Sequence, residues 1–257
     1  MMGLVLLVKL LAAPMMIALA SLAGKRWGPG VAGLLGGLPL VGAPVVISLW
    51  LSRGSGYAAE VALSAPVGVW ANIAYMLAVG YASAWFRWPL AILSGWLVYV
   101  AVALLLHWAG VAHSLGLGLL VLPSLWLAAA RGLPKPAAAP LAVHLPRVEI
   151  MTRMAAAAAL VLSLTGVSAL LGPSLTGLFT GAPIAATVIP AFTYAGAGRD
   201  ALLLVLRGFL IGLMGFVVFF YVLGYGIPLL GVMAWGPALL TGLGVGFGAA
   251  RLARRQA

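Results

Sequence analysis

Long apolar runs separated by short basic segments are the feature that most constrains this chain. Only 7% of its 257 residues are charged, whereas a soluble domain carries roughly 25%. So little charge cannot cover a water-facing surface, which excludes soluble and disordered proteins. Because backbone polar groups inside a bilayer must be paired internally, the sequence predicts an all-α polytopic membrane protein.

Nine stretches are apolar and long enough to cross a bilayer, which takes about 20 residues each. They cover residues 3–23, 31–51, 57–83, 89–107, 111–130, 148–171, 175–196, 201–223 and 226–249. Pro89 and Pro228 are each expected where a helix starts, a position that proline tolerates.

The basic residues of the predicted loops indicate an orientation. With the N-terminus outside, Arg53 alone falls in an outer segment, and ten basic residues fall in cytoplasmic segments: Lys25, Arg26, Arg87, Arg131, Lys135, Arg147, Arg199, Arg251, Arg254 and Arg255. Cytoplasmic loops are rich in Lys and Arg. We therefore expect the N-terminus outside, the C-terminus inside and an odd number of spans. The excess of Arg over Lys and the many Ala, Leu and Gly residues fit a bacterial source, so the expected location is a bacterial inner membrane.

A shift of 144 residues aligns the two halves of the chain. Six of the twelve residues in 28–39 are identical to those in 172–183. Five more identical pairs follow without a gap: Gly54 and Gly198, Val61 and Val205, Gly68 and Gly212, Gly80 and Gly224, and Tyr81 and Tyr225. Their concentration on Gly and Pro predicts an internal repeat.

Each repeat is expected to hold four spans, with one linker span between them. That odd span inverts the second repeat and predicts a 4+1+4 architecture. The first repeat covers 1–108, the linker helix and a Pro-rich cytoplasmic loop cover 109–147, and the second repeat with its basic tail covers 148–257. Inverted repeats are common among secondary transporters.

The second and seventh spans are interrupted by Gly and Pro at corresponding positions. Pro39 and Pro183 each remove a helix hydrogen bond, and Gly37 and Gly181 weaken the same turns. Freed backbone groups need polar partners, and such paired interruptions indicate a binding site. We therefore expect these four residues to bind substrate.

The same glycines have a structural explanation. Small residues four apart, such as Gly33 with Gly37 and Gly177 with Gly181, let two helices approach closely. Binding and close packing are compatible, and the sequence leaves both open.

Polar side chains inside the spans are few. Asn72 and Thr180 are expected at the substrate site. Arg207 would attract an anion or form a gate, and the alternative is that it snorkels to the inner interface. Glu60 would couple protons, and the alternative is an outer-interface carboxylate that reaches water. Charges inside a bilayer are costly, so each needs such a reason.

Enzyme chemistry is not expected. The chain has three acidic residues and no cysteine. It shows no catalytic Ser/His/Asp set, no metalloprotease motif and no phosphate loop. We predict no catalytic residue, no metal site and no cofactor. Nucleic acid is not an expected partner either, because the net charge of +11 forms no basic stripe with interleaved aromatics.

The residues of the first repeat resemble a small family. Ala32-Gly33-Leu34-Leu35, Leu38-Pro39, Gly56 with Ala59, and Tyr75 are similar to the pattern of the GlpM-like bacterial inner-membrane proteins. That resemblance implies two fused four-helix units and carries no activity with it. The plan is also similar to that of small multidrug and drug/metabolite transporters, in architecture only.

The leading hypothesis is therefore a secondary transporter of a small polar solute, with anions included because of Arg207. The expected partners are that solute and the lipid bilayer, and a homodimer stays open. One alternative is a non-transporting membrane component of an envelope-polymer or lipid system. Another is a channel or lipid scramblase.

Overall fold

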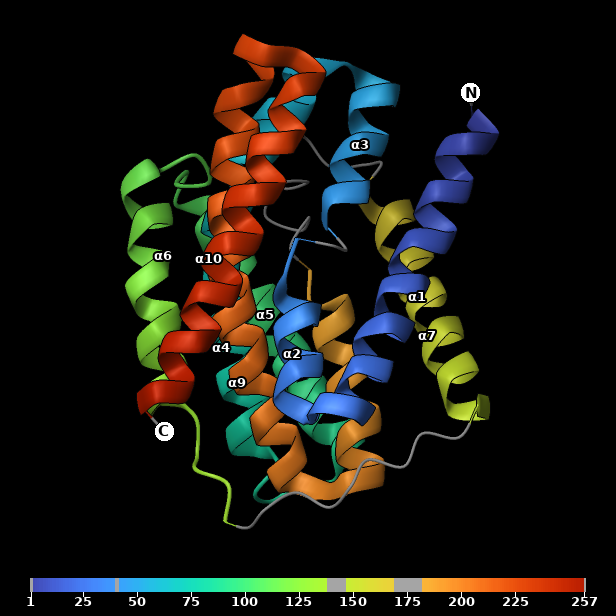
Figure 1. The fold of residues 1–257 in the computed structure, drawn as a ribbon, viewed down its shortest axis with the longest axis vertical. Helices are drawn as coiled ribbons and strands as arrows, with labels where there is room; N and C mark the ends of the chain where they lie inside the picture. The colour runs from blue at the N-terminus through green and yellow to red at the C-terminus, as the bar shows by residue number, and fades with distance from the viewer. Residues whose placement is uncertain (1, 40–41, 138–146, 169–181, 257) are drawn as a thin grey trace.

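The computed structural model is a bundle of helices that run mostly along one axis (Figure 1). It describes residues 2–39, 42–137, 147–168 and 182–256. Every regular element in these ranges is helical, which confirms the all-α class. The described part holds five apolar stretches that are long enough to cross a membrane: Pro29–Arg53, Ser55–Ala82, Trp88–Trp108, Leu115–Gly132 and Ile184–Arg255.

The described elements are all helices or helical turns. The first half contains α1 (Met2–Trp27), α2 (Pro29–Gly37), α3 (Gly42–Arg53), α4 (Ser55–Ala82) and α5 (Trp88–Trp108). The second half contains α6 (Leu115–Leu127), the π-helical turn η1 (Ala128–Gly132), α7 (Arg147–Ser168), α9 (Ile184–Leu230), the 3₁₀ turn η2 (Gly231–Ala234) and α10 (Trp235–Gln256).

Glycines with positive φ set the main changes of chain direction. Gly54 precedes α4 with φ 88° and ψ 172°, and Gly198 interrupts α9 with φ 80° and ψ −175°. Side chains disfavour this backbone conformation, so glycine is required at both points. At Gly198 the chain turns back, and α9 therefore consists of two antiparallel segments (Figure 1).

The prediction that Pro228 begins a helix is wrong. Pro228 lies inside the last turn of α9, and the next long helix, α10, begins at Trp235. The chain reverses at Gly231, whose φ of 55° ends α9, as a glycine after a helix commonly does. Pro89, in contrast, lies in the first turn of α5 as expected.

Glycine stripes bring α2 and α9 into backbone contact. A Cβ atom on Gly33 would meet the carbonyl oxygen of Val205, and one on Gly208 would meet the carbonyl oxygen of Gly30. Because only hydrogen occupies these positions, the two helices approach more closely than side chains allow. This contact holds the first half of the chain against the second.

The termini lie at opposite ends of the bundle (Figure 1). The α1–α2 junction, the α4–α5 junction and the bend in α9 lie at the end where the chain finishes. The α3–α4, α5–α6 and α9–α10 junctions lie at the other end. The large apolar side chains that remain exposed on α5, α6 and α10 include Leu97, Leu120 and Leu240, which is what a lipid-facing surface requires.

Candidate functional site

One cavity lies where α2 gives way to α3 and where α9 begins. The cavity has a volume of about 30 Å³. Its described lining consists of Gly36, Gly37, Leu38, Gly42, Asn72, Met76, Ala182, Pro183, Ala185, Ala186, Phe209, Leu213 and Phe216. The structure thus brings together three residues predicted from sequence: Gly37, Asn72 and Pro183.

The break between α2 and α3 follows from Pro39. The amide of Leu38 still donates to the carbonyl of Leu34 at 3.2 Å, so α2 closes its last turn before the break. Proline has no amide hydrogen to continue that ladder. The amide of Ala43 donates to the carbonyl of Pro39 at 2.8 Å and starts the next helix. Pro39 is buried but is not part of the described cavity lining.

The start of α9 follows from Pro183. Its backbone is non-helical, with φ −76° and ψ 52°, and α9 begins at the next residue, Ile184. The amide of Ile184 donates to the carbonyl of Ala182 at 2.7 Å in a tight turn. Two helices, α3 and α9, therefore start at the cavity, each with its positive dipole end there.

Asn72 supplies the polar side chain of the described lining. It lies on α4 with 2% of its surface exposed. Met76 lies one turn further along the same helix, and Phe209 and Phe216 face the cavity from α9. A cavity that holds one water molecule needs at least about 10–15 Å³ of space open to a water-sized sphere. The cavity therefore holds about two waters, and a larger solute needs the surrounding helices to move apart.

A hydrogen-bonded cluster lies next to the cavity. The buried Tyr75 hydroxyl lies 3.1 Å from both the carbonyl oxygen of Ala186 and the hydroxyl of Thr187. The indole of Trp96 donates to the same Thr187 hydroxyl at 3.0 Å. This cluster ties the start of α9 to α4 and α5. Sequence reasoning missed it, because the partners are more than 90 residues apart and share no motif.

Arg207 lies away from the cavity. Its guanidinium donates to the carbonyl oxygens of Leu133 and Pro134, at 3.0 and 3.2 Å. It therefore holds the segment that follows η1. Asp200 anchors the same segment by accepting a hydrogen bond from the amide of Ala137 at 2.9 Å.

The remaining predicted site residues are placed elsewhere or lie outside the described residues. The side chain of Glu60 is exposed near the start of α4. Gly37 lines the cavity, and a Cβ atom there would meet the carbonyl oxygen of Phe209. Gly37 thus takes part in helix packing as well. Gly181 and Thr180 lie outside the described residues.

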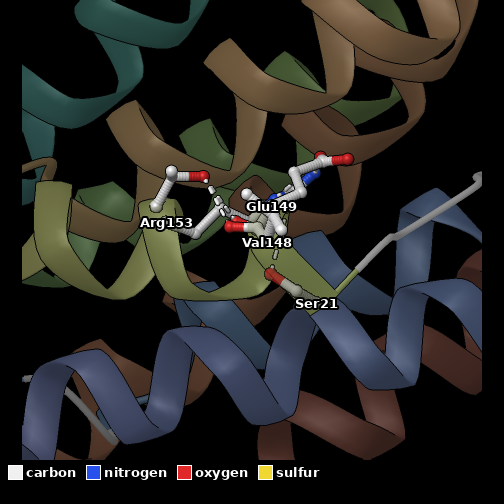
Figure 2. Close-up of polar contacts among 5 residues, drawn as sticks. Ser21, Val148, Glu149 and Arg153 are labelled. Atoms are coloured by element: carbon white, nitrogen blue, oxygen red, sulfur yellow. Dashed lines mark hydrogen bonds and ion pairs between the residues drawn. The ribbon is translucent and has the colours of Figure 1, made fainter.

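A buried ion pair joins three helices near the start of α7 (Figure 2). Arg153 is 2% exposed and contacts Glu149 at 2.6 Å. It also donates to the hydroxyl of Ser21 on α1 at 3.1 Å, and its guanidinium lies 5.2 Å from the ring centre of Phe192 on α9. The i, i+4 pair was predictable from spacing, whereas the contacts to α1 and α9 were not.

Contacts join helices at both ends of the bundle. At the end that holds the bend of α9, the Tyr194 hydroxyl donates to the carbonyls of Ser83 and Phe86, both at 2.9 Å. At the opposite end, Trp50 of α3 stacks on Trp235 of α10 with ring centres 6.2 Å apart. These contacts join α9 to the α4–α5 junction at one end of the bundle and α3 to α10 at the other.

Comparison of the chain with protein-family models, curated proteins and solved structures found no match. The class that the fold defines is therefore a coarse one: an all-helical protein with several long apolar helices, as an integral membrane protein has.

Proposed function

We propose that this protein is a secondary transporter of a small polar solute, with its site at the central cavity. One observation carries the proposal: the break between α2 and α3, the start of α9 and the buried Asn72 line the same space. Interrupted helices that meet near the bilayer midplane are how many transporters bind polar solutes without a charged cage. Backbone groups at the starts of α3 and α9 and the amide of Asn72 would provide the hydrogen bonds.

Residues 144 positions apart support an inverted repeat around this cavity. Three such pairs line it: Leu38 and Ala182, Gly42 and Ala186, and Asn72 and Phe216. Gly54 and Gly198 form another pair and share nearly the same φ and ψ angles. The shift of 144 residues also aligns the start of α1 with the start of α7, and the start of α4 with the start of the second segment of α9. Equivalent elements around a shared site are what alternating access between two halves requires.

The proposed topology has nine crossings, with the N-terminus outside and the C-terminus inside. It counts α2 and α3 as one interrupted crossing and the two segments of α9 as separate crossings. The opposite positions of the termini in Figure 1 support an odd number. The proposed location is a bacterial inner membrane. The kinship with GlpM-like proteins stays a proposal that depends on the short motif in the first repeat.

Cysteine labelling tests the function, because the chain has no native cysteine. Ala185→Cys and Met76→Cys place a thiol in the cavity lining. Gly37 is unsuitable, since a side chain there would meet the backbone of Phe209. The probe is 2-hydroxyethyl methanethiosulfonate, added to one side of oriented vesicles. Glutathione in the opposite compartment removes any reagent that crosses the bilayer.

Transport predicts that both thiols react from either side, at rates well below that of the exposed control Ser55→Cys. Reaction from one side alone would describe a dead-end pocket and contradict transport. An absence of reaction from both sides would mean that the interrupted helices are packing devices.

An absence of reaction from both sides would favour a second candidate function, a non-transporting membrane component. The backbone contact of α2 with α9 at Gly33 and Gly208 favours it, because such close packing serves assembly as well as transport. It predicts a permanently dry cavity and a protein partner that stays bound in mild detergent.

A further inference from the structure

We infer that the solute bound at the central cavity carries no net charge and presents a hydrogen-bond acceptor beside a small apolar body. This inference rests on the proposed transport function and specifies its substrate class. It departs from the expectation that Arg207 would select an anion.

The described cavity lining contains no ionisable side chain. Asn72 is its only polar side chain, and the rest are Gly, Ala, Pro, Leu, Met and Phe. Residues 40–41 and 169–181 lie outside the described residues, and their sequence contains no Lys, Arg, His, Asp or Glu. These segments therefore cannot bring a charge to the site, whatever their structure.

The charged side chains that the structure describes inside the predicted spans lie outside the cavity lining, and the two arginines among them bind other groups. Arg207 donates to the Leu133 and Pro134 carbonyls. Arg153 is paired with Glu149, and Glu60 is exposed. Helix α1, which carries Lys9, contributes no residue to the described lining. A charged solute would therefore meet no counter-charge among the described residues of the cavity lining.

The helix dipoles do not change this conclusion. The N-termini of α3 and α9 lie at the cavity, and each dipole end contributes about 0.3–1 kcal/mol, or up to about 2 when partly buried. A full charge at the bilayer centre costs at least about 2.5–3.5 kcal/mol, and the C-terminus of α2 opposes an anion there. The two N-termini are therefore suited to an acceptor oxygen on a neutral solute, and Phe209, Phe216 and Met76 to its apolar part.

Thiol reagents of different charge test this inference. Met76→Cys and Ala185→Cys are each treated with the neutral 2-hydroxyethyl, the anionic 2-sulfonatoethyl and the cationic trimethylammonioethyl methanethiosulfonates. Each rate is divided by the rate of the same reagent with 2-mercaptoethanol. The exposed Ser55→Cys is the matched control. If Met76→Cys folds poorly, Ala185→Cys decides, because it adds one sulfur atom to a small side chain.

The neutral reagent is expected to react at least about tenfold faster than either charged reagent in the cavity, which corresponds to about 1.4 kcal/mol. The three normalised rates at Ser55→Cys should agree within a few fold. A sulfonate rate equal to the neutral rate would overturn the inference in favour of an anion site, and an equal cationic rate would overturn it in favour of a cation site. A cavity unreactive to all three reagents would instead contradict the transport function itself.

Discussion

Single glycines have two structural roles in this bundle: they permit close helix contact, and they adopt backbone conformations with positive φ. Gly33 and Gly208 permit backbone contact between helices, while Gly54 and Gly198 adopt conformations that side chains disfavour. The Gly and Pro pattern predicted where the second span is interrupted, because loss of an amide and of a side chain acts locally. It could not predict that Arg207 bonds to Leu133, because that contact depends on how distant segments pack.

Gly33→Ala is expected to destabilise the fold. The added methyl meets the carbonyl of Val205 and the amide of Phe209, and backbone cannot yield as a flexible side chain does. Overpacking of this kind costs about 1–3 kcal/mol. Thermal unfolding in detergent measures it, with Gly56→Ala as the control because nothing lies within 4 Å of a Cβ atom there. Equal melting temperatures for the two variants would refute the close contact.

The Arg153–Glu149 pair should behave as a coupled unit. Glu149→Leu leaves the buried Arg153 guanidinium without its carboxylate and should cost about 3 kcal/mol, the low end for buried pairs, since the Glu149 side chain keeps 21% exposure. The double variant with Arg153→Met should recover most of that loss. The melting temperatures of the single and double variants show whether the two residues are energetically coupled. Losses that simply add would show that the pair is not coupled.

The end of α9 and the start of α10 were harder to predict from the sequence than the apolar segments themselves. The apolar pattern predicted the all-helical class, but it placed the start of the last span too early. The pattern could not separate Pro228 at the end of α9 from a proline that begins a helix. The deciding residue is Gly231, whose positive φ ends α9.

The bend in α9 is expected to require glycine at position 198. With φ 80° and ψ −175°, its backbone lies in a region that is essentially restricted to glycine and costs other residues about 1–3 kcal/mol. Gly198→Ala should therefore lower the melting temperature. Gly196→Ala is the control, because it adds a methyl in open space without a positive φ. A larger loss for Gly196→Ala would contradict the assignment of the bend to Gly198.

The described helices pack around a small cavity, and the described residues of its lining carry no ionisable side chain. Sequence alone predicted that Gly37, Asn72 and Pro183 take part in one site, and the structure brings them together. The Tyr75 cluster and the end contacts of Tyr194 and Trp50 were not predictable, because they join helices far apart in the chain.

Reciprocal access to the cavity is the most direct test of transport. Tyr194→Phe removes the one hydroxyl proton that the carbonyls of Ser83 and Phe86 share, a hydrogen bond with a net contribution of about 0.5–1.5 kcal/mol. In an Ala185→Cys background, alternation predicts that labelling from the cytoplasmic side rises about threefold to tenfold while labelling from the outside falls. Tyr81→Phe, at an exposed position, should change neither rate. Rates that rise together from both sides would indicate a continuous pore and contradict alternating access.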